Sequence, residues 1–298
     1  VSDESTIRKP ATIQQNQSIQ GIKHVIAVAS GKGGVGKSTI AANIAAILSE
    51  KSFKVGLLDL DIYGPSLPII LGLSEQPKVT SERKLIPLEF RGMKVMSFGF
   101  LSDDDSPAIW RGPLVARMTE QFFKDVIWGE LDYLVLDLPP GTGDVQLTLT
   151  QKIKISGAII VTTPQDIALA DVRKGANMFQ KVNAPILGVI ENMSGFQIEG
   201  KIIDNKGNSL SGGTVQISEA KETVVNEKGE FNLIIDLFKK GGGEKESERL
   251  GVPLLGIIPI SQEVMKATDA GLPIVFDSPE SVVSKIYREI GDRIIQAL

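Results

Sequence analysis

The sequence predicts an α/β fold with a doubly wound, mostly parallel sheet and a small antiparallel β insertion. Short apolar segments alternate with helical segments along most of the chain, which is typical of parallel strands buried on both faces. The alternation stops at residues 197–238, where brief strand-like segments are separated by Gly and Asn turns. We therefore expect a flexible tail at 1–20, a main α/β domain formed by 21–196 and 239–298, and a β-rich insertion at 197–238.

The expected elements follow from the spacing of the apolar residues. Strands are predicted at 24–29, 54–61, 94–98, 132–137, 157–163, 185–190 and 253–259, and helices at 38–50, 110–126, 167–181, 242–250 and 279–297. Short strands of the insertion are predicted at 201–204, 214–217, 223–225 and 231–235. The strand at 185–190 is expected to end in a turn at 191–194. The last helix mixes charges of both signs with one apolar stripe, which favours packing on the sheet over membrane attachment.

The composition argues against several kinds of function. With 42% hydrophobic and 23% charged residues and a net charge of −4, the 298-residue chain is typical of globular proteins and lacks the basic excess of a nucleic-acid-binding surface. No apolar run approaches the roughly 20 residues that span a bilayer, and the first residues are polar without an apolar signal core. We therefore expect a cytoplasmic protein with neither nucleic-acid nor membrane partners.

The chain contains no cysteine and a single histidine, His24. This excludes disulfides, thiol catalysis and metal or iron–sulfur sites built from the chain's own thiolates. His24 opens a predicted strand, so we interpret it as a strand residue rather than a ligand. The chemistry must rest on Lys, Asp, Ser, Thr, the backbone and a hard cation.

Residues 30–39 read SGKGGVGKST, between a predicted strand and a predicted helix. They fill the G-x-x-x-x-G-K-[ST] template of a phosphate-binding loop in the context that this template requires. Glycines let backbone N–H groups turn toward phosphate oxygens, and the helix N-terminus adds partial positive charge. The residues expected to hold a nucleotide are Gly31, Lys32, Gly33, Gly34, Val35, Gly36, Lys37, Ser38 and Thr39. Lys37 is expected to reach the β- and γ-phosphates.

Lys32 gives the loop a second lysine, directly after the first glycine. One interpretation is a solvated loop residue. The other is a cation that points away from its own nucleotide and reaches the nucleotide of a facing subunit, as an arginine finger does in trans. The second interpretation makes the active species a homodimer.

Three aspartates stand where two predicted strands end, and ligand groups of open parallel sheets gather at such ends. Asp59 and Asp61 close the strand at 54–61, and Asp137 closes the strand at 132–137. Helix capping or solvation of the strand ends is the alternative interpretation.

A magnesium site is expected beside the loop. Asp137 has the position of an acid that holds Mg²⁺ through water, and the hydroxyl of Ser38 is a direct ligand in such loops. Ser38, Asp59 and Asp137 are therefore the expected metal-site residues. The Pro- and Gly-rich segment after Asp137 can bring the amide of Gly141 to a γ-phosphate and change shape when that phosphate leaves.

These motifs resemble those of the deviant Walker A ATPases, which include MinD, ParA and the nitrogenase iron protein. The similarity is greater to the Mrp (ApbC-like) ATPases, a family regarded as iron–sulfur cluster carriers. The shared stretches are LLDLDIYGPS at 57–66, WRGP at 110–113, LDYLVLDLPPGTGDVQLTL at 131–149, VTTPQDIALADVRK at 161–174, PILGVIENMS at 185–194 and GGGEKESERLGVPLLGIIPI at 241–260. The resemblance covers about residues 22–196 and 240–298.

The resemblance implies an ATPase that uses ATP, rather than GTP, together with Mg²⁺. It implies that Lys32 crosses to the nucleotide of the partner subunit and that Asp61 positions the attacking water, so Lys32, Lys37 and Asp61 are the expected catalytic residues. It also implies that residues 137–144 form a second switch segment and that Asn192 contacts the adenine.

The chain departs from the family pattern after Ser194. Family members typically carry a Cys-x-x-Cys pair after the N-M-S turn, through which two subunits share a cluster, whereas here the β insertion follows. The insertion resembles part of a carboxypeptidase-regulatory-like β-sandwich. Because the chain has no thiol, its sequence argues against carriage of a cluster in the family's manner.

The sequence therefore supports best a homodimeric, Mg²⁺-dependent ATPase of the Mrp type, linked to iron–sulfur cluster assembly or transfer. Residues 197–238 are then expected to dock onto a thiol-bearing assembly or client protein. The alternative is a cysteine-free, ATP-driven switch of the MinD or ParA kind, whose insertion binds a protein partner and which carries no cluster.

Overall fold

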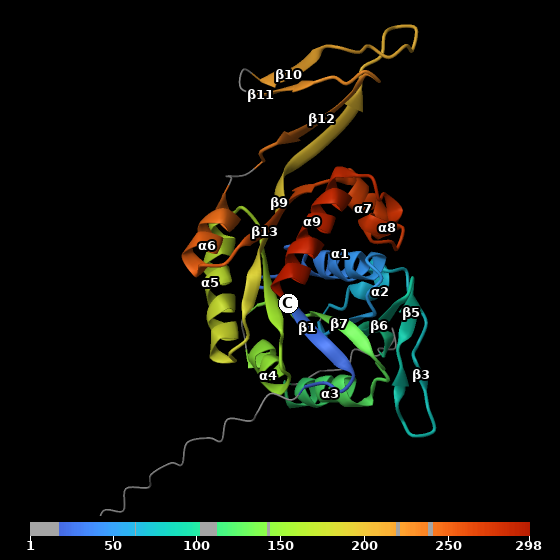
Figure 1. Cartoon of the computed structure of the whole chain (residues 1–298), viewed down its shortest axis with the longest axis vertical. Helices are drawn as coiled ribbons and strands as arrows, with labels where there is room; N and C mark the ends of the chain where they lie inside the picture. Colours follow the sequence, from blue (N-terminus) through green and yellow to red (C-terminus); the bar gives the residue numbers. More distant parts are fainter. Residues whose placement is uncertain (1–17, 63, 102–111, 142–143, 219–220, 238–240) are drawn as a thin grey trace, which may run out of the picture.

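The structure is a computed structural model that describes residues 18–62, 64–101, 112–141, 144–218, 221–237 and 241–298. Its main sheet has the strand order β13-β9-β8-β1-β7-β2-β6-β5 (Figure 1). The strands are β1 (Ile22–Ser30), β2 (Val55–Asp59), β5 (Leu88–Phe90), β6 (Met93–Ser97), β7 (Leu131–Asp137), β8 (Gly157–Thr162), β9 (Ile186–Lys201) and β13 (Leu254–Ile260). Neighbours in this order are parallel, except that β5 is antiparallel to β6.

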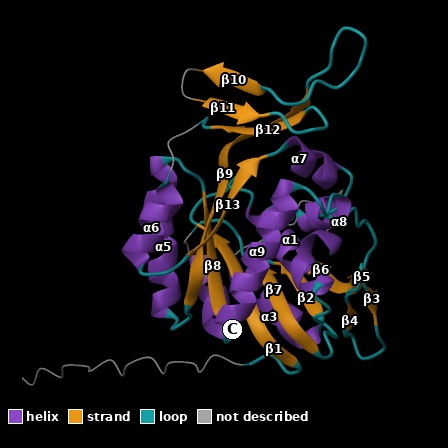
Figure 2. Cartoon of the chain, turned by 45° about the horizontal axis from the view of Figure 1, so that its top comes forward, coloured by secondary structure: helices purple, strands orange, loops and turns teal. Residues whose placement is uncertain are grey.

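Helices cover both faces of the sheet (Figure 2). They are α1 (Lys37–Glu50), α2 (Leu67–Ile70), α3 (Gly112–Asp125), α4 (Asp144–Lys152), α5 (Asp166–Lys181), α6 (Gly242–Leu250), α7 (Gln262–Asp269), α8 (Ile274–Asp277) and α9 (Val282–Ala297), with a short 3-10 helix at Phe98–Phe100. Helix α1 packs on β1, β7 and β2, and α5 packs on β8. Successive side chains of β8 point to opposite faces of the sheet, so both faces carry an apolar layer. Ile159 belongs to the main core, whereas Ile160 packs with Val172 and Ala176 of α5.

The predicted doubly wound, mostly parallel sheet is confirmed. Apart from β9, the predicted strands and helices of the main domain lie within three residues of the observed bounds. Two short strands, β3 (Lys78–Val79) and β4 (Leu85–Ile86), form an additional hairpin. Most of the predicted tail at 1–20, and parts of the segments at 110–113 and 137–144, lie outside the described residues. None of the helices in the described ranges is long and apolar enough to cross a membrane.

Strand β9 differs from its prediction. The strand was expected to end at Ile190, but it continues through the predicted turn at 191–194 to Lys201. Met193 and Gly195 have positive φ angles of 57° and 83°, and the pairing with β13 shifts register nearby. Such a bulge bends a strand without ending it, so the N-M-S-G segment redirects β9 where a turn was expected.

Beyond the bend, β9 forms a projection that we call the arm (residues 197–237). Strand β12 (Glu230–Ile235) pairs antiparallel with the end of β9, and β10 (Thr214–Ser218) pairs with β11 (Lys221–Val224) above it (Figure 1). In place of the predicted strand at 201–204, β9 ends at Lys201 and Ile203 makes only an isolated bridge to Ser209. The arm extends from the carboxyl ends of the parallel strands, the edge at which α1 begins.

Candidate functional site

The phosphate loop (residues 31–36) connects the buried end of β1 to the first residue of α1, Lys37. Gly34 and Gly36 have φ angles of 76° and 79°, a conformation that favours glycine over residues with a Cβ. Gly36 is the N-cap of α1 and provides no side-chain cap. The local sequence therefore produces a backbone cradle next to the positive end of a helix dipole.

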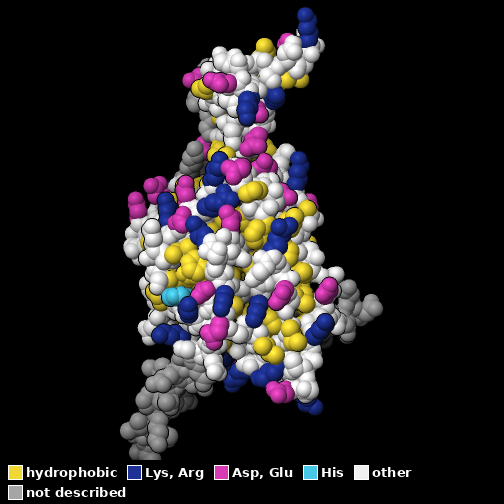
Figure 3. Space-filling model, turned by 45° about the vertical axis from the view of Figure 1, so that its right-hand side comes forward, with side chains coloured by type: hydrophobic (Ala, Val, Ile, Leu, Met, Phe, Trp, Pro, Cys, Tyr) yellow, Lys and Arg dark blue, Asp and Glu magenta, His cyan; other side chains and the backbone are white. Residues whose placement is uncertain are grey.

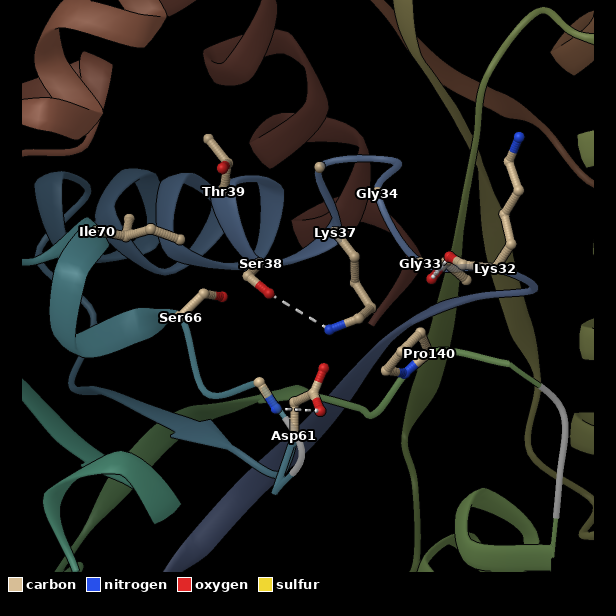
Figure 4. Close-up of a pocket in the computed structure, with 13 residues that line it drawn as sticks. Lys32, Gly33, Gly34, Lys37, Ser38, Thr39, Asp61, Ser66, Ile70 and Pro140 are labelled. Carbon is tan, nitrogen blue, oxygen red and sulfur yellow. Dashed lines mark hydrogen bonds between the residues drawn. The ribbon is translucent and has the colours of Figure 1, made fainter. Parts of the chain in front are cut away.

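The loop borders a cavity of about 270 Å³ (Figure 4). Residues from three connections meet there, because β1, β7 and β2 are neighbours and their carboxyl ends face the same edge. The lining residues are Ser30, Lys32, Gly33, Gly34, Gly36, Lys37, Ser38, Thr39, Asp61, Gly64, Ser66, Ile70 and Pro140. The structure thus brings most of the predicted loop residues together with Asp61.

Lys37 and Asp137 form an ion pair behind the loop. The side chain of Lys37 is 6% exposed and that of Asp137 is fully buried. Burial raises the pKa of Asp137, while Lys37 and the hydroxyl of Ser38 act in the opposite direction. The second oxygen of Asp137, Oδ2, is buried and has no hydrogen-bond partner among the described residues. This oxygen can accept a hydrogen bond from a further donor or from a water bound to a cation.

Asp59 is fully buried beside this pair and lies outside the cavity lining. Its carboxylate accepts hydrogen bonds from the amide of Asp61 at 2.9 Å, the hydroxyl of Ser97 at 3.0 Å and the amide of Leu67 at 3.3 Å. Burial and the negative charge of Asp137 raise the pKa of Asp59 to about 7. Asp59 therefore organises the segment that presents Asp61 to the cavity.

The site offers the hard oxygen donors that Mg²⁺ prefers. Ser38 and Asp61 line the cavity, and Asp137 holds an unpartnered buried oxygen nearby. Within the described ranges no group of three or more acidic or histidine side chains could hold a metal by itself. Magnesium in nucleotide sites is held by one or two protein oxygens together with phosphates and waters, so these residues fit such an ion.

Lys32 points away from Lys37 in Figure 4. Its ammonium donates a hydrogen bond of 3.4 Å to the side-chain carbonyl of Gln165, at the N-cap of α5. The two loop lysines therefore diverge: Lys37 is directed into its own loop and Lys32 is directed outward.

Two other predicted residues lie next to the loop rather than in the cavity lining. The amide of Gly141 donates to the carbonyl of Ser30 at 3.0 Å, with a φ angle of 94° at Gly141. The side-chain amide of Asn192 donates to the carbonyl of Val35 at 2.8 Å. The cavity also includes Ser66 and Ile70, which the sequence did not single out. Ser66 is the N-cap of α2, and a serine followed by a proline in the first turn, here Pro68, is a sequence signal for a helix start.

A family model described as NUBPL iron-transfer P-loop NTPase, of the ParA group, matches residues 21–225 and 223–295. The chain belongs to this family. The predicted resemblance to iron–sulfur carrier ATPases is thereby confirmed, and the MinD- and ParA-like alternative is not favoured.

The names of similar proteins support this assignment of the NUBPL-type NTPase. It is 42% identical over 281 residues to the iron–sulfur protein required for NADH dehydrogenase of Arabidopsis thaliana mitochondria, covering 94% of this chain and 80% of the relative. It is 41% identical over 287 residues to the iron–sulfur cluster carrier protein of Escherichia coli K12, covering 96% and 70%.

Solved structures support the same fold. A nucleotide-binding protein from Archaeoglobus fulgidus in complex with ADP superposes with a TM-score of 0.67 at 35% identity, covering 87% of this NUBPL-type chain and 90% of that one. The cell-division ATPase MinD of Pyrococcus furiosus superposes with a TM-score of 0.62 at 20% identity, covering 92% and 99%. At that identity the MinD similarity concerns the fold alone.

Proposed function

We propose that this NTPase binds and hydrolyses ATP with Mg²⁺, as a homodimer, in iron–sulfur cluster assembly or transfer. The observation that carries the proposal is the meeting of Lys37 and Asp137 beneath a glycine loop, at the ends of neighbouring strands β1 and β7. The ADP bound to the 35%-identical archaeal protein supports a nucleotide as the ligand.

In this proposal the loop amides and Lys37 hold the phosphates. Lys37 exchanges its contact with Asp137 for one with the β- and γ-phosphates, since a charged lysine binds where negative charge is greatest. Ser38 and Asp137 would hold Mg²⁺, Asp137 through water, and the ion would supply charge neutralisation. Asp59 was predicted as a further metal-site residue, and its bonds to Asp61, Ser97 and Leu67 favour a supporting role instead.

Asp61 is proposed to orient the attacking water, because it lines the cavity and lies across from Lys37 and Ser38 (Figure 4). The Gly141 amide is proposed to leave the Ser30 carbonyl and donate to the γ-phosphate. Asn192 was predicted to contact the adenine; in that role its side chain would exchange the Val35 carbonyl for the base.

The homodimer is proposed from the direction of Lys32. A lysine that points out of its own site adds little charge there, but it can stabilise the γ-phosphate held by a facing subunit. Lys32, Lys37 and Asp61 would then act together on one nucleotide, two of them from one subunit and one from the other.

Phosphate release tests this proposal, with ATP as the expected substrate and GTP as the comparison. The wild-type chain should release phosphate from ATP in the presence of Mg²⁺ and lose that activity in EDTA. Lys37→Ala should lower the rate by at least about 100-fold, since a charge-stabilising group in a water-poor site contributes that much. An unchanged rate in Lys37→Ala would refute the assignment of the loop.

Iron–sulfur chemistry enters this proposal as cargo. No residue of the chain is a cysteine, so a thiol-bearing partner would hold the cluster. Anaerobic reconstitution of the isolated chain with iron and sulfide should give no stable cluster absorbance. A stable bound cluster on the isolated chain would show that other side chains ligate it.

The arm is the proposed docking surface for that partner. Figure 3 shows it as a narrow projection above the main domain. It carries exposed apolar side chains at Ile203, Leu210, Val224 and Leu237, and Val224 is 74% exposed. A thiol-bearing scaffold protein should bind the full chain and lose binding to Val224→Lys, whereas Lys228→Ala, a change on the same arm, should bind normally.

A further inference from the structure

The segment at 191–195 lies between the phosphate loop and the arm and contacts both. On the loop side, the side-chain amide of Asn192 donates to the carbonyl of Val35 at 2.8 Å, and both residues are buried. Gly36 packs so closely on Asn192 that a Cβ atom at residue 36 would collide with this amide. Any change in the loop backbone at Val35 and Gly36 therefore has to move Asn192.

On the other side of the strand, Glu191 fixes the base of the arm. Its carboxylate, 1% exposed, accepts hydrogen bonds from the hydroxyl of Ser194, at 2.6 Å, and from the amide of Gly243. Gly243 lies in the first turn of α6, shortly after the chain returns from the arm. One carboxylate thus holds the outgoing and the returning chain together.

Between these contacts the backbone is bent into an unusual conformation. Met193 has a positive φ angle of 57°, a conformation that a residue with a Cβ keeps only where the surroundings hold it, whereas Gly195 adopts its φ of 83° without strain. Gly195 packs against Ile234 and Ile235 of β12, so a Cβ atom there would collide with the side chain of Ile234. Phe196, the next residue, pairs with Ile235 on one edge and with Ile260 of β13 on the other. The bend therefore sets the direction in which β12 and the arm leave the sheet.

We propose that Asn192 is a positioning residue that transmits nucleotide occupancy of the phosphate loop to the arm. Nucleotide binding changes the contact between Asn192 and the Val35 carbonyl, the bend at Met193 and Gly195 adjusts, and β12 moves with it. This inference rests on the proposed nucleotide binding at the loop. It adds that the docking surface responds to the nucleotide.

Hydrogen exchange of the full chain with and without Mg²⁺ and ADP tests the proposal. Saturating ADP should protect the loop amides of the wild type and change exchange at 230–235 by at least about threefold, as expected for a coupled local opening. Asn192→Ala, compared at an ADP concentration that gives the same loop protection, should lose the change at 230–235. Asn208→Ala is the matched control, since Asn208 is exposed and its side-chain amide donates to the carboxylate of Asp204, at 2.9 Å, within the same turn of the arm.

A second variant keeps the test valid if Asn192→Ala does not fold. Ser194→Ala removes a part-buried hydroxyl that contacts Glu191, and it should reduce the response at 230–235 while loop protection remains. Loop protection without any arm response in the wild type, or an arm response in Asn192→Ala equal to that of the wild type, overturns the inference. Absence of loop protection in the wild type refutes instead the nucleotide binding on which the inference rests.

Discussion

The ammonium of Lys37 and the carboxylate of Asp137 form a buried ion pair that joins the first residue of α1 to the last residue of β7. The two residues are 100 positions apart in the chain. Parallel pairing of β1 with β7 brings them together, because Val28 lies opposite Asp137. Each charge offsets the free-energy cost of burying the other. A substitution of either site residue therefore changes the stability of the fold.

Lys37→Ala should lower the free energy of unfolding as well as activity. Removing one partner of a buried pair leaves an uncompensated charge, and such changes cost about 3–5 kcal/mol. Denaturant unfolding of Lys37→Ala and of Lys37→Ala/Asp137→Asn measures this. The second substitution should recover part of the loss because it removes the unpaired charge; equal stability of the two variants would contradict the explanation.

The stability of the fold should depend on pH through Asp59. Burial and Asp137 raise the pKa of Asp59 to about 7 in the folded state, whereas in the unfolded chain its pKa is near the ordinary value of 3.8. Between about pH 4 and pH 7 the unfolded state therefore binds fewer protons than the folded state, and the free energy of unfolding falls as pH rises, by up to about 1.3 kcal/mol per pH unit.

Asp59→Asn isolates this effect. The substitution removes the charge and keeps the size of the side chain, so the stability of the variant relative to wild type should increase from pH 4 to pH 7 and stay constant above. Urea unfolding at intervals of one pH unit gives the difference. A difference that does not change with pH would show that Asp59 titrates in the folded chain as it does in the unfolded chain.

Lys32→Ala should separate nucleotide binding from hydrolysis. Because Lys32 is directed out of its own loop, each subunit should bind ADP within about threefold of wild type, whereas ATP turnover should fall by about 100-fold or more as the trans cation is lost. Equilibrium binding and phosphate release measure the two quantities. Gln165→Ala, which removes only the hydrogen-bond partner of Lys32, is the control and should keep turnover.

Gly36→Ala should weaken nucleotide binding. At a φ of 79° an alanine is strained, and its Cβ would collide with the amide of Asn192. Binding of ADP should weaken by more than about tenfold, as a loss beyond 1.4 kcal/mol implies. Gly213→Ala, at a glycine with open space around it, should bind ADP as wild type does; equal weakening in both variants would contradict a local cause.

The sheet and the phosphate loop could be predicted because their signals are local. Apolar strands alternate with helices, and the loop template lies between one of each. The bend in β9 could not be predicted in the same way. Asn-Met-Ser-Gly is typical of a turn, and only the pairing of Phe196 with both β12 and β13 keeps the strand continuous. Helix α4 was also missed, since DVQLTLTQK alternates as a strand would.

Only the part of the candidate site that has local sequence signals could be predicted. The positions of Lys37, Ser38 and Asp61 at the cavity follow from the strand order and the loop template. The contacts of Asn192 with Val35 and of Glu191 with Gly243 join residues that are far apart in sequence, and no local pattern encodes them. They depend on how β9 and α6 pack around the arm.

The most direct test of the two-subunit ATP switch is phosphate release from a mixture of two inactive variants. Lys32→Ala lacks the cation that stabilises the γ-phosphate bound to the partner subunit. Asp61→Asn lacks the acid that orients water at the nucleotide of its own subunit. A mixed dimer restores one complete site, formed by Asp61 of one subunit and Lys32 of the other. Equal mixing should recover about one quarter of the wild-type rate, the share of complete sites for random pairing. A mixture no more active than its two components would contradict the account.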